Sequence, residues 1–123
     1  MASNKDAAIA FLELAAAGRA REAFVKYGGA GFRHHNPWFK GDADSLAAAM
    51  DDNARQNPGK RLEVLRALAD GDLVAVHSSV KHSDADRGFA LVHIFRFEGG
   101  RIVEAWDVAQ EVPAESPNAN GMF

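Results

Sequence analysis

The segment from residue 88 to residue 110 constrains the fold of this chain most, because its pattern is typical of a β-hairpin. Two runs of β-branched and aromatic residues flank the break Glu98-Gly99-Gly100. By the two-residue period of a strand, His93 in the first run shares a face with the apolar residues Leu91, Phe95 and Phe97. In the second run Asp107 shares a face with two alanines. The hairpin therefore carries one imidazole and one carboxylate on otherwise apolar faces.

The length of the hairpin loop decides whether His93 and Asp107 lie near each other. A two-residue loop, Gly99-Gly100, would place His93 opposite Trp106, whereas a three-residue loop would place it opposite Ala105. We favour the three-residue loop, which makes His93 and Asp107 diagonal neighbours with Cβ atoms roughly 7 Å apart. This register collects a mostly apolar set on one face: Leu91, His93, Phe95, Phe97, Val103, Ala105 and Asp107.

That face predicts a pocket for a small molecule. His93 and Asp107 are its candidate catalytic pair, and Leu91, Phe95 and Ala105 are its candidate ligand-binding wall. A buried carboxylate without a partner costs several kcal/mol unless it is protonated, and the alanines beside Asp107 offer it no hydrogen bond. The alternative is purely structural, with His93 as a core side chain and Asp107 as a buried acceptor.

Composition limits the classes of function. The chain has 123 residues, of which 47% are hydrophobic and 25% charged, as expected for one globular domain spanning residues 1–123 with a tail at 112–123. The net charge of -3 comes without a basic cluster, which argues against nucleic acid and acidic membrane surfaces as partners. The absence of cysteine excludes disulfides and thiolate chemistry. No charged signal region precedes the apolar run at residues 7–12, so we expect a cytoplasmic protein. The scattered charges suit a small apolar or carbonyl-containing ligand.

The remaining segments predict an α+β fold. Ser3 and Asp6 form a capping box before a helix that ends at Gly18, and a second helix covers residues 20–27. A short strand follows at 32–36, then a helix capped by Asp42 or Asp44 that ends before residue 57. Long strands are expected at 61–69 and 73–82. We predict a cone-shaped barrel in which a curved, mostly antiparallel sheet wraps around three N-terminal helices.

The short strand and its loop supply further candidates. His35 would point into the open end of the cone as a third candidate catalytic residue, while His34 would point away. The loop after Pro37 exposes two aromatic residues, Trp38 and Phe39, as a candidate lid that contacts ligand. His77 shares its face with small residues and is a ligand-binding candidate, although a solvent-facing histidine explains it nearly as well.

A metal site is the alternative use of these histidines. Imidazoles with one carboxylate would suit Zn or Fe, but the sequence has no closely spaced histidine pair of the HxH or HxxxH kind. We therefore expect neither a metal nor an organic cofactor.

Two further expectations concern surfaces. The opposite face of the hairpin is also apolar and predicts a homodimer formed sheet to sheet; it carries Val92, Ile94, Ile102, Trp106 and Val108. The tail ends in Met122-Phe123, so we expect it to fold back and to place Met122 or Phe123 at the cavity mouth of its own or the partner subunit. A disordered tail is the alternative, because the tail is rich in Pro, Asn and Gly.

The element order, the motif HHNP at residues 34–37 and the hairpin sequence VHIFRFEGGRIVEAWDVAQ resemble the SnoaL-like polyketide cyclase family of the NTF2-like superfamily. The resemblance implies a usually dimeric cone whose cavity performs acid/base chemistry without a cofactor: aldol cyclisation, isomerisation, dehydration or epoxide opening. By this resemblance His93 matches an oxyanion-hole position of ketosteroid isomerases, and His35-Asn36 lies near their general base. Because His and Asn replace that aspartate, Asp107 is the better base. A non-catalytic binding or assembly domain remains the alternative.

Overall fold

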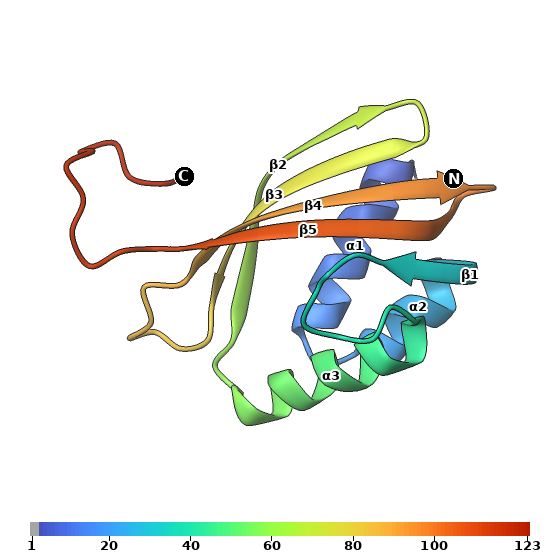
Figure 1. The fold of residues 1–123 in the computed structure, drawn as a ribbon, viewed down its shortest axis with the longest axis horizontal. Helices are drawn as coiled ribbons and strands as arrows, with labels where there is room; N and C mark the ends of the chain where they lie inside the picture. Colours follow the sequence, from blue (N-terminus) through green and yellow to red (C-terminus); the bar gives the residue numbers. More distant parts are fainter. Residues whose placement is uncertain (1–2) are drawn as a thin grey trace.

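The computed structural model describes residues 3–123 as three helices and five strands (Figure 1). In chain order these are α1 (Asn4–Ala16), α2 (Ala20–Tyr27), β1 (Gly28–His34), α3 (Ala43–Gln56), β2 (Arg61–Asp70), β3 (Leu73–Lys81), β4 (Phe89–Glu98) and β5 (Arg101–Glu111). The strands form one sheet in the order β1-β5-β4-β3-β2, in which β1 runs parallel to β5 and the other neighbours are antiparallel. The α+β class is confirmed, and the mixed sheet is open, with β1 and β2 as its edge strands.

Side-chain caps begin two of the helices, as the sequence predicts. The Ser3 Oγ accepts a hydrogen bond of 3.1 Å from the backbone N–H of Asp6 at the start of α1. The Asp42 carboxylate accepts one of 2.9 Å from the backbone N–H of Ser45 at the start of α3. Such caps satisfy N–H groups that have no partner within the helix.

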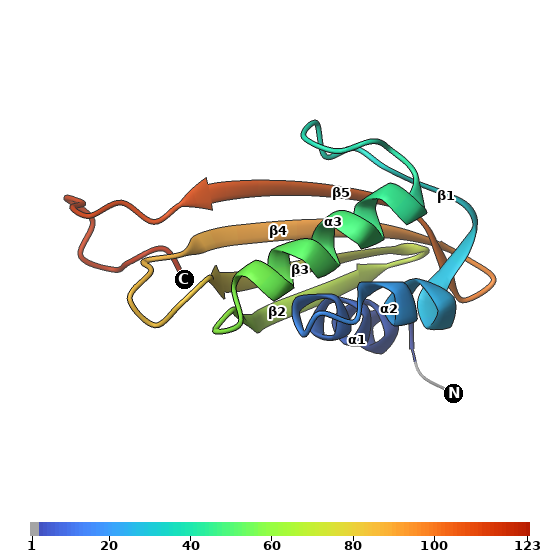
Figure 2. The same ribbon diagram turned by 90° about the horizontal axis from the view of Figure 1, so that it is seen from below.

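All three helices lie on one side of the sheet (Figure 2). The core forms between α1 and the inner sheet face, where the Phe11 ring meets Phe95 at 5.7 Å and Phe24 at 5.0 Å in edge-to-face contacts. Val74 and Val76 of β3 are fully buried in the same cluster. No helix among residues 3–123 covers the opposite, outer face of the sheet.

The hairpin register corrects the prediction of a three-residue loop. Glu98 pairs with Arg101 across a two-residue turn in which Gly99 and Gly100 have φ values of 56° and 80°. Positive φ at both positions is the requirement of a type I′ turn, which Gly-Gly meets without strain. A bulge in β5 just after the turn then adds one residue, so His93 pairs directly with Asp107.

The β5 bulge also changes which residues face the core. Ile102, expected on the outer face, is fully buried in the core, where Val103 was expected. A second irregularity in β2 after Val64 turns Ala67 toward the core in place of Arg66. Strict alternation is therefore broken at one position in each of these strands.

A search of the helices in residues 3–123 finds none that combines the length and the apolar character needed to cross a membrane.

Candidate active site

A cavity of about 270 Å³ lies between the helices and the inner face of the sheet. Its wall is mainly apolar, with Phe11, Phe32, Leu91, Phe95 and Ala105 among the lining residues. Four polar side chains from β1, β4, β5 and the loop after β1 gather in this wall: His34, His93, Asp107 and Asn36. Apolar lining with a few convergent polar groups is the usual character of a small-molecule site.

His93 and Asp107 are direct cross-strand partners on the inner face. They are therefore closer than the diagonal relation that we expected, since directly opposed residues have Cβ atoms about 5 Å apart. The His93 ring stacks on Phe95 with 5.7 Å between ring centres. Its Nδ1 is buried and has no hydrogen-bond partner among residues 3–123. Burial lowers the pKa of His93 and the nearby Asp107 carboxylate opposes that shift, so the imidazole is neutral at pH 7.

Asn36 joins this pair through hydrogen bonds that fix its amide orientation. Its Nδ2 donates to Asp107 Oδ2 at 3.0 Å, while its Oδ1 accepts from the backbone N–H of Trp38 at 3.0 Å. Because a backbone N–H can only donate, the amide nitrogen of Asn36 must be the atom that faces the carboxylate. One carboxylate oxygen of Asp107 is thus held by protein, and the other has no hydrogen bond from residues 3–123.

The adjacent histidines of β1 have the reverse of the predicted orientation. His34 is buried in the cavity wall, where its Nε2 donates to the Lys40 carbonyl at 2.6 Å and its Nδ1 accepts from the backbone N–H of Asn36 at 3.1 Å. His35 lies on the outer face, against Trp106. The prediction that His35 lines the cavity is wrong, because side chains alternate along β1 and the buried Phe32 and His34 take the inner face.

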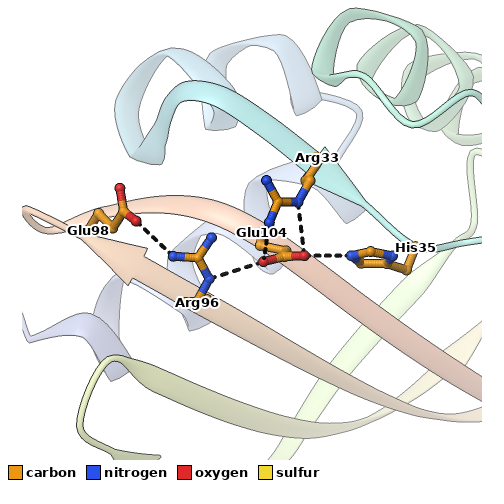
Figure 3. Close-up of polar contacts among 5 residues, drawn as sticks. All are labelled: Arg33, His35, Arg96, Glu98 and Glu104. Atoms are coloured by element: carbon orange, nitrogen blue, oxygen red, sulfur yellow. Dashed lines mark hydrogen bonds and ion pairs between the residues drawn. The ribbon is translucent and has the colours of Figure 1, made fainter.

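On the outer face, His35 belongs to a charge cluster around Glu104 (Figure 3). Its Nε2 lies 2.6 Å from a Glu104 oxygen, while Arg33 and Arg96 each donate to the carboxylate at 3.0 Å. The hydrogen bond from His35 lowers the pKa of Glu104 to about 2, and those from Arg33 and Arg96 add to the effect. The Glu104 side chain is only 8% exposed, so these partners compensate for its burial.

The other predicted ligand-binding residues divide between the cavity and the surface. Leu91, Phe95 and Ala105 line the cavity, as do Asn36 and Phe39. Trp38 is 84% exposed in the loop and is not among the lining residues.

His77 and Phe123 lie together on the outer face, where their ring centres are 6.2 Å apart. Met122 shares a shallow groove there with Val92 and Val108. The tail therefore folds back, but the prediction that it covers the cavity mouth of its own subunit is wrong. Pro113 and Pro117 follow the end of β5, and the tail reaches the sheet face opposite the helices.

Sequence reasoning missed four polar residues of the cavity. His34 was placed outside, and Asn53, Lys60 and His82 were not considered. The two-residue period places Lys60 on the face of Leu62 and His82 on the face of Val80, and Asn53 follows Met50 at helical spacing, so periodicity could have found all three.

Among residues 3–123 no three His, Asp or Glu side chains group so as to hold a metal ion.

The comparisons with known proteins agree with this fold. The profile of the SnoaL-like domain family matches residues 8–105, which include the inner residues of β4 and part of β5. The chain therefore belongs to the SnoaL-like domain family. A search of the curated proteins finds no significant match.

Solved structures share the fold at low sequence identity. An NTF2-like protein of unknown function from Cytophaga hutchinsonii aligns with a TM-score of 0.72 at 13% identity, over 89% of this chain and 92% of that one. A candidate polyketide cyclase from Bacillus cereus aligns with a TM-score of 0.74 at 22% identity, over 85% and 72%. A candidate isomerase of the SnoaL-like family from Agrobacterium tumefaciens aligns with a TM-score of 0.71 at 15% identity, over 87% and 97%.

Proposed function

We propose that this protein is a small-molecule enzyme of the cyclase or isomerase type that performs acid/base chemistry on a carbonyl compound without a cofactor. The observation that carries the proposal is the direct pairing of His93 with Asp107 in an apolar cavity, with Asn36 bonded to the carboxylate. Family membership and the candidate cyclase and isomerase among the similar structures support the same class.

In this mechanism Asp107 is the base. Asn36 holds Oδ2, which orients the carboxylate and leaves Oδ1 to take a proton from a carbon next to a carbonyl group. The C–H electron pair moves into the enolate, and the neutral His93 imidazole donates a hydrogen bond to the enolate oxygen. Because burial lowers the pKa of His93, the imidazole is neutral and acts here as an uncharged hydrogen-bond donor.

The enolate then has two outcomes. In an aldol cyclisation its carbon attacks a second carbonyl of the same molecule, a C–C bond forms, and the proton on Asp107 passes to the new alkoxide. In an isomerisation the same proton returns to a different carbon. Both outcomes leave Asp107 ionised again, so the cycle needs no other reactant.

The test is exchange of α-protons in D2O, followed by NMR with 2-tetralone as the probe ketone. We expect Asp107→Asn to slow exchange by about 100-fold or more, the usual contribution of a general base. Asp70→Asn is the matched control, because Asp70 is an exposed carboxylate at the end of β2. If wild-type protein exchanges 2-tetralone and related fused-ring ketones no faster than Asp107→Asn, the site is not catalytic in this way. The non-catalytic binding domain would then be the better explanation.

A further inference from the structure

The cavity has a second polar group at the end away from Asp107. Lys60, Asn53 and His82 line it there, and they come from the α3–β2 connection, the last turns of α3 and the residue after β3. Both ribbon views show the α3–β2 connection and the β3–β4 loop at the same end of the sheet (Figures 1 and 2). The cavity is therefore apolar in its middle and polar at two separate places.

Lys60 is a cation at this end, and residues 3–123 give it no anionic partner. Its Nζ donates to the Asn53 Oδ1 at 2.8 Å, and the ion pairs among residues 3–123 do not include it. Its burial is enough to lower the pKa of the ammonium group. A partly desolvated ammonium that faces a cavity gains from an anion placed beside it.

Asp86, the carboxylate beside His82, has its own hydrogen-bond partners. Its two oxygens accept hydrogen bonds from the backbone N–H groups of His82 at 3.0 Å and Gly88 at 3.1 Å, and His82 Nδ1 lies 3.4 Å away. Asp86 does not line the cavity, whereas the His82 ring does. The charge of Asp86 therefore orients His82 and does not neutralise Lys60.

The distance between the two polar ends follows from β4. The His82 ring packs on Phe89 with 5.8 Å between ring centres, and Phe89 stands four residues before His93 on the same strand. At about 3.3 Å per residue the two ends are roughly 13 Å apart. With a hydrogen bond of about 3 Å at each end, roughly 7 Å remains for the ligand body, which is the length of two or three fused rings.

We propose that Lys60, with Asn53 and His82, binds an anionic group of the ligand, so that the ligand is an amphipathic acid with its charge at one end and an apolar body in the cavity. That the other end presents an enolisable carbonyl to Asp107 rests on the proposed function. The anion site itself does not, because it is built from other residues at another end of the cavity.

The experiment compares two fluorescent probes that differ in one charged group. 1-Anilinonaphthalene-8-sulfonate carries an anion, and N-phenyl-1-naphthylamine has the same ring system without it. We expect wild-type protein to prefer the anionic probe, and Lys60→Met to lose at least about tenfold in affinity for it while its affinity for the neutral probe changes less than about twofold. Lys60→Arg should keep the preference. Lys5→Met, on the exposed surface of α1, is the control for the change in net charge.

Two outcomes would overturn the anion site: a wild-type protein that binds both probes equally, or a Lys60→Met variant that keeps the preference. An equal loss of both probes in Lys60→Met would mean a damaged cavity, and Lys60→Arg then decides: a kept preference for the anionic probe supports the anion site, and a lost preference overturns it. Asp107→Asn separates this proposal from the catalytic one. It should keep the probe preference of the wild type and lose proton exchange, whereas Lys60→Met should keep exchange of the neutral ketone 2-tetralone.

Discussion

The two faces of the sheet differ in whether their buried polar groups have hydrogen-bond partners. On the outer face the Glu104 carboxylate has Arg33, Arg96 and His35 as partners. On the inner face His93 Nδ1 and Ser78 Oγ are buried with no hydrogen-bond partner among residues 3–123. Buried polar groups in proteins are nearly always paired, so exceptions on one face of a sheet need an explanation.

This difference distinguishes a cluster that stabilises the fold from a cavity wall that can bind a ligand. A cluster in which every group has a partner holds elements together, and the Glu104 cluster joins β1 to β5 and β4. On the inner face one oxygen of the Asp107 carboxylate in the cavity wall has no hydrogen bond from residues 3–123, so a ligand can supply one. His34 and His35 reach the two faces from adjacent positions, since one lines the cavity and the other belongs to the cluster.

The largest effect on stability should come from removing the outer carboxylate. Glu104→Gln leaves Arg33, Arg96 and His35 around a neutral amide, and breaking a buried ion cluster from one side is strongly destabilising. Asp107→Asn is the matched change on the inner face of the same strand and should cost far less. Urea unfolding of both variants measures the difference. Equal losses, or a larger loss for Asp107→Asn, would contradict the division between the two faces.

The Glu104 cluster should also make the stability of the protein depend on pH. The pKa of Glu104 falls from 4.5 to about 2 in the folded protein, so protons favour the unfolded state. Its stabilisation is complete above pH 4.5 and is lost as the pH falls toward 2. We expect Glu104→Gln to flatten the stability curve in this window, measured by thermal unfolding between pH 5 and pH 2. A variant curve parallel to that of the wild type would show that other carboxylates cause the loss.

A smaller effect is expected at His93. Phenylalanine keeps the aromatic stack on Phe95 and removes a buried nitrogen without a partner, so His93→Phe should change the unfolding free energy by less than about 1 kcal/mol. The lowered pKa of folded His93 means that the unfolded state binds its proton first, so wild-type stability falls as the pH drops below 6.5. The variant should lack this loss and should also lose proton exchange. A strongly destabilised His93→Phe would instead make His93 a structural residue.

Much of the fold could be predicted from local patterns. The caps at Ser3 and Asp42, the three helices and the long strands follow from residue types within a few positions of each other. Register could not, because the bulge in β5 moves Asp107 opposite His93 without any distinctive residue to announce it. The orientation of His34 and His35 depends on the parallel pairing of β1 with β5, a contact between segments about 70 residues apart.

Changes on the outer face that block self-association should affect folding least. Beyond the Glu104 cluster this face exposes large apolar side chains, with Leu68 65% and Val108 68% accessible. We propose that a second copy of the chain packs on it. Trp106→Glu is a poor probe, because Trp106 also stacks on His35 at 5.1 Å. Val108→Glu is cleaner, since Val108 lies in the shallow groove beside Met122.

We expect wild-type protein to sediment as a dimer at micromolar concentration and Val108→Glu to sediment as a monomer, because the interface would bury an unpaired charge. When both proteins are compared as monomers, the unfolding free energy of Val108→Glu should differ from that of the wild type by less than about 0.5 kcal/mol, as for most surface substitutions. Deleting residues 118–123 should alter association but leave binding in the cavity unchanged, since Phe123 lies against His77 on the outer face. A deletion that weakens probe binding in the cavity would mean that the tail of one subunit reaches the cavity of its partner.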